Sequence, residues 1–282
     1  MPPMKWKIGR VTVTQIIELD LTGGTRFILP QASREEVRKH AWLTPDFADA
    51  EGRLRMTIHA FVLETPTRRI VVDTGLGNDK ENRPIPTWNR LNGPFLNDLT
   101  AAGYPPESID MVLCTHLHVD HVGWNTRLVD GRWVPTFPNA RYVMGRVEFE
   151  HWKQQHALGR SIVFADSVQP VAEAGLVDLV ESDAVLSDEI SLIPTPGHSP
   201  GHMSVHLKSD GAQALLLGDA AHHPCQMAHI DWSSTADSDP VQSARTRHDL
   251  FERFIEIPAI VLAGHFVGGR IVRDGKAYRL DR

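Results

Sequence analysis

The chain has 282 residues, of which 41% are hydrophobic and 23% charged, and this composition excludes a disordered or fibrous protein. A net charge of -6 and two cysteines exclude a basic nucleic-acid-binding domain and a disulfide framework. No apolar stretch is long enough to span a bilayer and no signal region opens the sequence, so we expect no membrane association and a cytoplasmic location. The 15 histidines stand out, because histidine is the commonest metal ligand.

The hydrophobic patterns along the chain alternate between strands and helices. In chain order they predict a strand at 6–19, a helix at 33–42, a strand pair at 56–64 and 69–73, a helix at 95–102, strands at 109–114 and 140–145, and a helix at 146–157. They continue with short strands within 178–195 and at 205–207 and 214–217, a helix at 239–255, a strand at 259–263 and a hairpin turning at Asp274 and Gly275. This order predicts an α/β protein with strands in the middle and helices outside.

Two connections are longer than the others. Residues 22–52 and 76–92 are rich in turn-forming residues, and the first contains the helical stretch that begins with Ser33 and Glu36 at capping-box spacing. Because no shift in composition marks a linker, we predict a single domain over 1–282. We expect the two long loops to lie near the functional site or at a dimer interface.

Four polar side chains follow the end of one predicted strand, namely His116, His118, Asp120 and His121. In an extended segment residues 116, 118 and 120 share one face, and a turn would bring residue 121 to the same side. Imidazole nitrogens and carboxylate oxygens suit Zn²⁺, and suit Fe or Mn less uniquely. An ordinary solvated turn is the alternative for this segment taken alone.

Three further residues of the ligand type also follow apolar strands. His198, Asp219 and His265 each come directly after a glycine, which lets the backbone turn sharply and approach closely. Loops at strand ends are where α/β proteins usually carry functional groups. The seven residues supply five imidazoles and two carboxylates, which suits two metal ions with open positions for water.

These motifs resemble those of the metallo-β-lactamase superfamily. The resemblance rests on Thr-His-Leu-His-Val-Asp-His at 115–121, Thr-Pro-Gly-His at 195–198, Gly-Asp at 218–219, Gly-His at 264–265 and the early motif Asp-Thr-Gly at 73–75. The motifs occur in the order of the family and cover nearly the whole chain. The resemblance implies an α/β fold, the four-layer αβ/βα sandwich, in which two central mixed sheets carry helices on both outer faces.

The resemblance also implies how the seven residues divide between two Zn²⁺ ions, with Fe, Mn and Co as alternatives. His116, His118 and His198 would hold the first metal. Asp120, His121 and His265 would hold the second. Asp219 would bridge both, with a hydroxide between the metals. Asp73 is similar to the family's aspartate that steadies the histidine loop.

A metal-dependent hydrolysis is the reaction that this resemblance implies. Hydroxide between two cations attacks a carbonyl or phosphoryl centre, and the metals stabilise the charge that develops. Asp120 would relay a proton to the leaving group. The stretch at 120–125 and the residues after Asp219 are most similar to the branch of N-acyl-homoserine-lactone lactonases and methyl-parathion-type hydrolases. We therefore expect an enzyme that opens a lactone, a quorum-quenching reaction, or cleaves a small carboxylic ester.

One position departs from the lactonase pattern. The lactonases carry a tyrosine three residues after the bridging aspartate, where this chain has His222, as in the organophosphate-hydrolase pattern. An imidazole can still protonate a leaving alkoxide or donate to an oxyanion, so His222 is a candidate catalytic residue. The alternative is that His222 and its neighbour His223 are exposed loop residues, with His223 the weaker candidate for a substrate contact.

Three alternatives to a lactonase stay open. The first is an organophosphate or aryl-ester hydrolase of the methyl-parathion type. The second is a glyoxalase-II-like thioesterase, which would bind an anionic substrate with basic residues such as Arg270 and Arg273. The third is a non-catalytic metal-binding module, which would be expected to have lost ligands that this chain retains. A small-molecule ester or lactone is the expected partner, no nucleic acid is expected, and the resemblance implies a homodimer.

A few other residues carry expectations of their own. For Trp124 the alternatives are a pocket wall and core packing, and we expect packing. His202 is expected to lie beside the metal ligands, and His206 to face solvent. Cys114 ends an apolar strand and is expected to be buried and inert.

Overall fold

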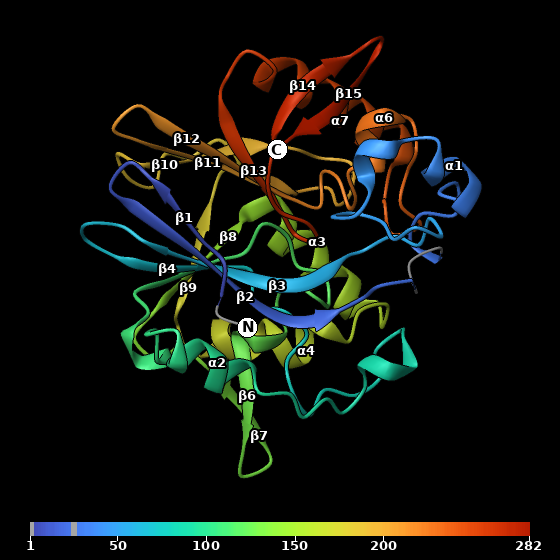
Figure 1. Cartoon of the computed structure of the whole chain (residues 1–282). Coiled ribbons are helices and arrows are strands. Elements are labelled where there is room, and N and C mark those ends of the chain that lie inside the picture. The colour runs from blue at the N-terminus through green and yellow to red at the C-terminus, as the bar shows by residue number, and fades with distance from the viewer. Residues whose placement is uncertain (1–2, 24–26) are drawn as a thin grey trace. The chain divides into compact units, whose positions relative to one another are not determined.

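The computed structural model describes residues 3–23 and 27–282, and the chain divides into two compact units. Unit 1 comprises the chain up to Glu18 together with Ile58–Glu181, and unit 2 comprises Leu19–Thr57 together with Ser182–Arg282. Figure 1 shows the elements of both units, coloured along the chain. Residues 24–26 of the predicted loop at 22–52 lie outside the described residues. The prediction of a single domain stays a prediction.

Unit 1 contains a seven-stranded mixed sheet. Its strands, in chain order and in spatial order, are β1 (Lys5–Ile8), β2 (Val11–Asp20), β3 (Thr57–Glu64), β4 (Arg69–Val72), β5 (Met111–Leu113), β8 (Arg141–Gly145) and β9 (Val177–Val180). β1 pairs with β2 and β3 with β4 in antiparallel fashion, whereas β4, β5, β8 and β9 run parallel. Because Val72 pairs with Leu113, the residues that follow β4 and β5 leave the sheet at the same edge.

The predicted strand at 6–19 is a pair of strands. Gly9 has a φ of 56°, a left-handed conformation that glycine adopts without a steric penalty, and it forms the turn that lets Ile8 pair with Val11. The hydrophobic alternation continues on both sides of this turn. The pattern therefore predicted the strand content but not the hairpin between β1 and β2.

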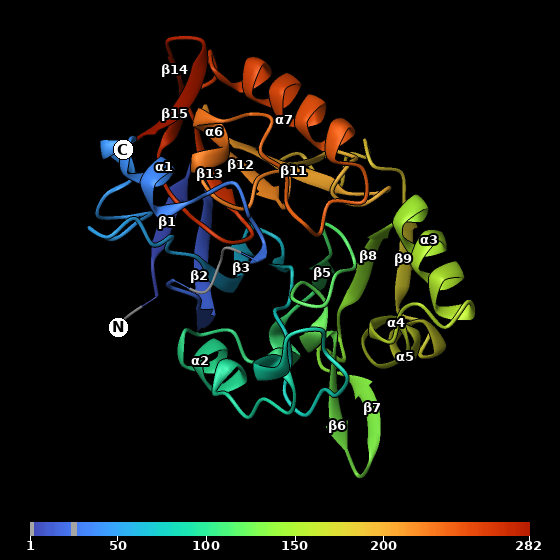
Figure 2. The same ribbon diagram turned by 90° about the vertical axis from the view of Figure 1, so that its right-hand side faces the viewer.

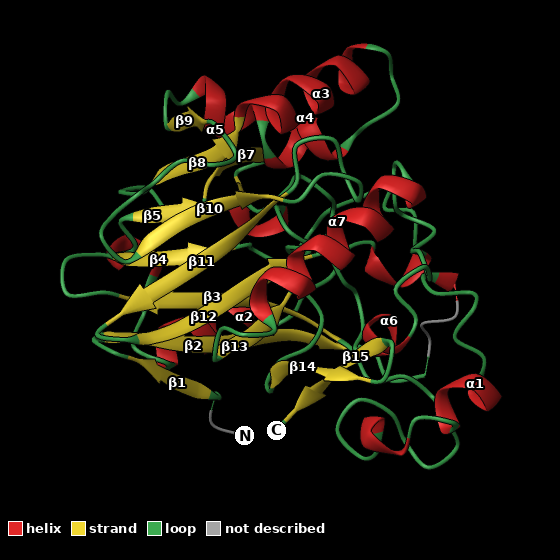
Figure 3. Ribbon diagram, turned by 90° about the horizontal axis from the view of Figure 1, so that it is seen from above, coloured by secondary structure: helices red, strands yellow, loops and turns green. Residues whose placement is uncertain are grey.

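Unit 1 also contains four α-helices and a separate hairpin among its described residues. They are α2 (Phe95–Ala101), α3 (Arg146–Ala157), α4 (Val163–Ser167) and α5 (Gln169–Glu173), and the hairpin strands are β6 (Thr126–Val129) and β7 (Arg132–Pro135). Figure 3 shows α3 and α4 alongside β8. Phe95, Phe149 and Phe164 from the helices join Val112 and Tyr142 from the sheet in one apolar core. The helices predicted at 95–102 and 146–157 are confirmed, whereas α4, α5 and the hairpin are too short for their periodicity to be recognised.

Unit 2 contains a four-stranded mixed sheet and a hairpin. The sheet order is β10 (Ile190–Pro194), β11 (Met203–Ser209), β12 (Ala212–Gly218) and β13 (Ala259–Ala263), and the hairpin is β14 (Arg270–Asp274) with β15 (Ala277–Asp281). β10, β11 and β12 alternate in direction, so β10 and β12 end at the same edge of the sheet. β12 and β13 are parallel, with Gly218 beside Ala263, so β13 ends there too.

The described residues of unit 2 form three α-helices, namely α1 (Arg34–Arg38), α6 (Cys225–Ala228) and α7 (Pro240–Phe254). Ser33 caps α1 by accepting from Glu36 N, as predicted, but the helix ends at Arg38 and a 3₁₀ turn follows at Ala41–Leu43. Figure 2 shows α7 running along the four-stranded sheet. Its Phe251 and Phe254 pack in one core with Leu215 and Val261 of the strands.

Two expectations about single residues can be judged from the packing. His206 in β11 was expected to face solvent, and this is wrong, because its side chain packs edge-on against Phe254 of α7 and hydrogen-bonds Gln213. Cys114 is buried as expected, and burial raises the pKa of its thiol. No helix among the described residues is both long and apolar enough to cross a bilayer.

Candidate metal centre

The loop after β5 carries the four predicted ligands of unit 1, and Asp73 holds this loop in place. Asp73 follows β4 at the same sheet edge and has a φ of 56°. Its two carboxylate oxygens accept from Thr115 N and Thr115 Oγ1, each at 2.8 Å. His121 Nδ1 lies 2.9 Å from Asp73 Oδ2. One buried carboxylate therefore fixes both the start and the end of the histidine segment.

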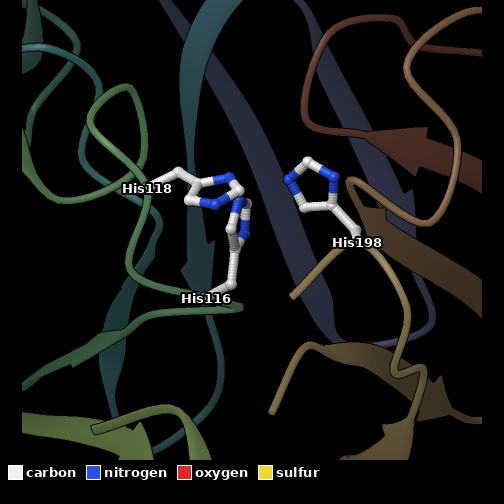
Figure 4. Close-up of side chains that lie close together, drawn as sticks. All are labelled: His116, His118 and His198. Atoms are coloured by element: carbon white, nitrogen blue, oxygen red, sulfur yellow. The ribbon is translucent and has the colours of Figure 1, made fainter. Parts of the chain in front are cut away.

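The rings of this segment lie close together. The centroids of His116 and His118 lie 4.6 Å apart, edge to face, as Figure 4 shows. Those of His116 and His121 lie 4.1 Å apart, and His121 Nε2 lies 3.9 Å from Asp120 Oδ1. His116 and His121 are fully buried, whereas His118 and Asp120 are half-buried. Unit 1 thus brings all four of its predicted ligands into one cluster.

A second buried carboxylate, Glu18 of β2, supports the neighbouring backbone. It accepts from Leu76 N at 2.6 Å, Gly77 N at 3.1 Å and Trp124 Nε1 at 2.7 Å. Burial raises the pKa of the Glu18 carboxyl, and these three donors oppose the rise. Trp124 stacks on Phe95 in the core, so its expected packing role is confirmed. No pattern in the sequence indicated Glu18, which lies 55 residues before the first motif at Asp73.

The sheet edge of unit 2 gathers the other predicted ligands. His198, Asp219 and His265 follow β10, β12 and β13, which all end at this edge. Asp219 Oδ2 lies 3.5 Å from His198 Nε2 and 3.1 Å from His265 Nε2. His222 Nε2 approaches the same oxygen at 3.2 Å. Each of these side chains is at most 5% exposed.

His202 lies beside this cluster, as expected. Its Nε2 accepts from Asp219 N at 2.9 Å, and its Nδ1 donates to Thr195. His202 therefore holds the backbone of Asp219 rather than pointing at the cluster. The ring of His198, also drawn in Figure 4, packs edge-on against His202 with centroids 5.8 Å apart.

His222 and the adjacent His223 have different surroundings. Both backbone N–H groups point to Gln226 Oε1, but the His223 ring turns into the core, where its Nε2 donates to Phe47 O at 2.7 Å. Burial lowers the pKa of His223 to about 4. The His222 Nδ1 is buried without a hydrogen-bond partner. The exposed-loop alternative is therefore wrong for both residues.

The hydrogen bonds of the histidine rings fit a metal ligand set. His121 Nδ1 points to Asp73, His198 Nδ1 to Asp237 and His265 Nδ1 to the carbonyl of Thr57. His116 Nδ1 lies 3.1 Å from Thr115 Oγ1, whose proton goes to Asp73. Because these acceptors bind the Nδ1 protons, Nε2 is the nitrogen of each ring that would bind a metal ion.

Comparison with known proteins identifies the family to which the chain belongs. A family model described as "Metallo-beta-lactamase superfamily" matches residues 55–265, which include every motif from Asp73 to His265. The chain belongs to the metallo-β-lactamase superfamily. Its two mixed sheets with packed helices are of that superfamily's α/β fold, so the predicted fold class is confirmed.

Curated relatives within the superfamily include lactonases. The chain is 27% identical over 179 residues to the N-acyl homoserine lactonase AiiA of Bacillus thuringiensis subsp. kurstaki, covering 58% of this chain and 63% of that protein. It is 27% identical over 177 residues to the N-acyl homoserine lactonase AttM of Agrobacterium fabrum, covering 57% of this chain and 64% of that protein. The matches thus span less than two thirds of the length of these relatives.

Two solved structures resemble the chain over nearly its full length. The hydrolase AbOPH of the beta lactamase superfamily is 25% identical, with a TM-score of 0.79, covering 99% of this chain and 96% of that one. AidC, a dizinc quorum-quenching lactonase in complex with a product, is 19% identical, with a TM-score of 0.78 and the same coverage. At 19% identity, the similarity to AidC concerns the fold alone.

Several residues that shape the candidate centre were not expected from the sequence. Asp237 and the carbonyl of Thr57 hold ligand rings, as described above. Arg247 of α7 is fully buried and donates to the carbonyls of Ala220, Ile230 and Trp232, which fixes the loop that carries His222. A buried arginine whose partners are mostly backbone carbonyls leaves no recognisable motif.

Proposed function

We propose that the protein is a metal-dependent hydrolase that opens a lactone or cleaves a small carboxylic ester. The observation that carries this proposal is the packing of His198, His222 and His265 around one buried oxygen of Asp219. Imidazoles and carboxylates buried together form the donor sets of hydrolytic zinc sites. Superfamily membership and the lactonases among the relatives support the reaction class.

We further propose that the seven predicted ligands hold two ions, with Zn²⁺ preferred over Fe, Mn and Co. His116, His118 and His198 are proposed for one ion, Asp120, His121 and His265 for the other, and Asp219 for both. Unit 1 supplies four of these residues and unit 2 supplies three, and the family model includes all seven.

The ions, when bound, would supply Lewis acidity, which lowers the pKa of water and polarises a substrate carbonyl. The side chains of the protein have separate tasks. Asp73 and the Thr57 carbonyl orient His121 and His265 through their Nδ1 atoms. Asp120 is half-buried at the end of the histidine loop, and we propose that it carries a proton to the leaving group.

His222 is proposed as the residue that assists the leaving alkoxide. Its backbone N donates to Gln226 Oε1, its Nε2 lies 3.2 Å from Asp219 Oδ2, and its Nδ1 is buried without a hydrogen-bond partner among the described residues. The doubly protonated form of such an imidazole has an Nδ1 proton that no protein acceptor binds and that can be donated to a leaving group. This distinguishes His222 from His198 and His265, whose Nδ1 protons are bound by protein oxygens.

Hydrolysis of an organophosphate or aryl ester is the second candidate function. The observation that favours it is His222 itself, which stands where the lactonase pattern has tyrosine. The variant His222→Tyr separates the two candidates, because it restores the lactonase pattern at this position. A lactonase should keep or gain lactone turnover in this variant, whereas a phosphotriesterase should not.

The decisive experiment assays the zinc-loaded protein on lactones, aryl esters, phosphotriesters, thioesters and β-lactams. We expect turnover of a lactone or carboxylic ester that a chelator abolishes and zinc restores. His248→Ala is the matched control, since His248 is an exposed histidine of α7. Preference for a phosphotriester or thioester would replace the proposed substrate class. No turnover of any substrate by protein with full metal content would leave a metal-binding module and overturn the proposal.

Two further parts of the proposal concern the surroundings of the protein. We propose that it acts on free small molecules in the cytoplasm and that it forms a homodimer, as the resemblance implies. Light scattering coupled to size exclusion should give twice the chain mass of 31.5 kDa, and a monomer mass would contradict the dimer. Cell fractionation tests the compartment.

A further inference from the structure

We propose that Asp237 is a positioning residue that fixes the imidazole of His198 with its Nδ1 protonated and its Nε2 as the nitrogen that would bind a metal ion. This inference rests on the proposed function, because it concerns one of the proposed ligands. Asp237 belongs to none of the sequence motifs. It lies 39 residues beyond His198, in the segment just before α7.

The contact between the two side chains is short and buried. His198 Nδ1 lies 2.8 Å from Asp237 Oδ1, and the side chains are 1% and 0% exposed. The other carboxylate oxygen of Asp237 accepts from Ser234 N at 3.1 Å. A carboxylate can only accept in this geometry, so the proton of the bond sits on His198 Nδ1. Because both side chains are buried, this hydrogen bond holds both the orientation and the tautomer of the His198 ring.

The backbones on both sides of this contact are also joined. Ser238 N donates to His198 O and Asp239 N donates to Gly197 O, both at 2.9 Å. Asp239 in turn caps α7 by accepting from Gln242 N. The segment that carries Asp237 therefore lies along the turn that carries His198, and the start of α7 fixes its position.

Gly197 shows how closely this turn approaches α7. Its φ is 129°, and a Cβ added there would lie 2.3 Å from Ser243 N. Thr246 Oγ1 of the same helix donates to Pro196 O at 2.7 Å. The turn thus has little freedom to shift, which leaves rotation of the His198 ring as the freedom that Asp237 removes.

Unit 1 contains an equivalent arrangement. His121 Nδ1 lies 2.9 Å from Asp73 Oδ2, and this carboxylate is also held by a second donor. His265 and His116 use weaker neutral acceptors, a carbonyl and a hydroxyl. Each unit therefore contains a proposed ligand whose Nδ1 contacts a buried carboxylate, and in unit 2 that carboxylate is Asp237.

The test measures zinc affinity of Asp237→Ala and Asp237→Asn by competition with a chelator, and the absorption spectrum of the cobalt-substituted proteins. Removal of such an acceptor typically weakens metal binding about 10–100-fold, and we expect this loss and an altered cobalt spectrum for Asp237→Ala. Asparagine keeps one oxygen that can accept from His198, so Asp237→Asn should recover most of the affinity and the wild-type spectrum. Asp178→Ala, which removes an exposed partner of Arg141, should change neither.

The outcomes separate this inference from the proposed function. Wild-type affinity in folded Asp237→Ala, or an equal loss in both Asp237 variants, would overturn the positioning role and leave the metal centre standing. Failure of the wild-type protein to bind metal would overturn the proposed function itself. If Asp237→Ala does not fold, Asp237→Asn decides alone: a wild-type cobalt spectrum supports the inference, and a spectrum without the d–d bands of bound cobalt overturns it.

Discussion

The two units build their parts of the candidate centre in opposite ways. In unit 1 the four ligands lie within six residues after one strand, His116 to His121, and a carboxylate from the neighbouring strand holds them. In unit 2 His198, Asp219 and His265 follow three different strands and meet because these strands end at the same sheet edge. The first part is local in sequence, whereas the second depends on sheet register.

This difference predicts how each part responds to change. The histidine loop of unit 1, which the buried Asp73 carboxylate holds, should lose its ordered conformation when that carboxylate is removed. A cluster assembled by a sheet should keep its backbone but lose function when the shared carboxylate is removed. The variants below test this contrast, from the largest expected effect to the smallest.

Removing a proposed ligand from either unit should have the largest effect. We expect Asp219→Ala and His118→Ala each to lower hydrolysis by more than about a hundredfold, beyond the typical loss for residues that only support ligands. Steady-state kinetics at saturating zinc measure this, with His248→Ala as the control. Near-normal turnover in one variant but not the other would show that only one unit carries the reaction.

Removing the anchor of the unit 1 loop should have the next largest effect. Asp73→Ala should weaken zinc binding by about 10–100-fold, since it frees His121 and both donors of Thr115. Hydrogen exchange of residues 115–121 should accelerate in this variant. If Asp237→Ala disorders its loop as strongly as Asp73→Ala does, the contrast between the units is wrong.

His222→Ala should reduce kcat by about tenfold to a hundredfold, in line with the lower part of the range for general acid catalysis. Its zinc content should stay at the wild-type level, because His222 is not one of the seven proposed ligands. An unchanged rate would show that His222 does not assist the leaving group. A loss of bound zinc would instead make it a metal ligand.

His223 should affect stability rather than activity. Its folded-state pKa of about 4 lies below the ordinary value of 6.5, so the unfolded chain binds more protons between these values and stability falls as the pH falls through them. The full difference corresponds to about 3 kcal/mol of unfolding free energy. Urea unfolding at pH 7 and pH 4 should show a smaller drop for His223→Gln than for the wild type. An equal drop in both proteins would contradict the assignment.

The sequence predicted those features whose determinants are close together along the chain. The helix at 146–157 and the strand at 259–263 have the predicted bounds, and the ligand motifs are recognisable by spacing alone. Asp237, Glu18 and Arg247 could not be predicted, because each acts through a partner that only the folded chain brings near.

The residues that were misassigned from the sequence were misassigned for the same reason. His206 follows a pattern that would place it on a solvent face, but α7 covers that face and Phe254 packs against the ring. His223 was the weaker candidate for a substrate contact, and its burial against Phe47 could not be seen without the packing of the 22–52 loop. Burial by a segment that is distant in the sequence leaves no local pattern from which it could be predicted.

The central claim is that the seven proposed ligands hold two metal ions. Metal content of the protein, purified without chelator and saturated with zinc, tests it most directly. The account predicts about two equivalents per chain, falling towards none in Asp219→Ala. Fewer than one tightly bound equivalent in the wild-type protein would contradict it.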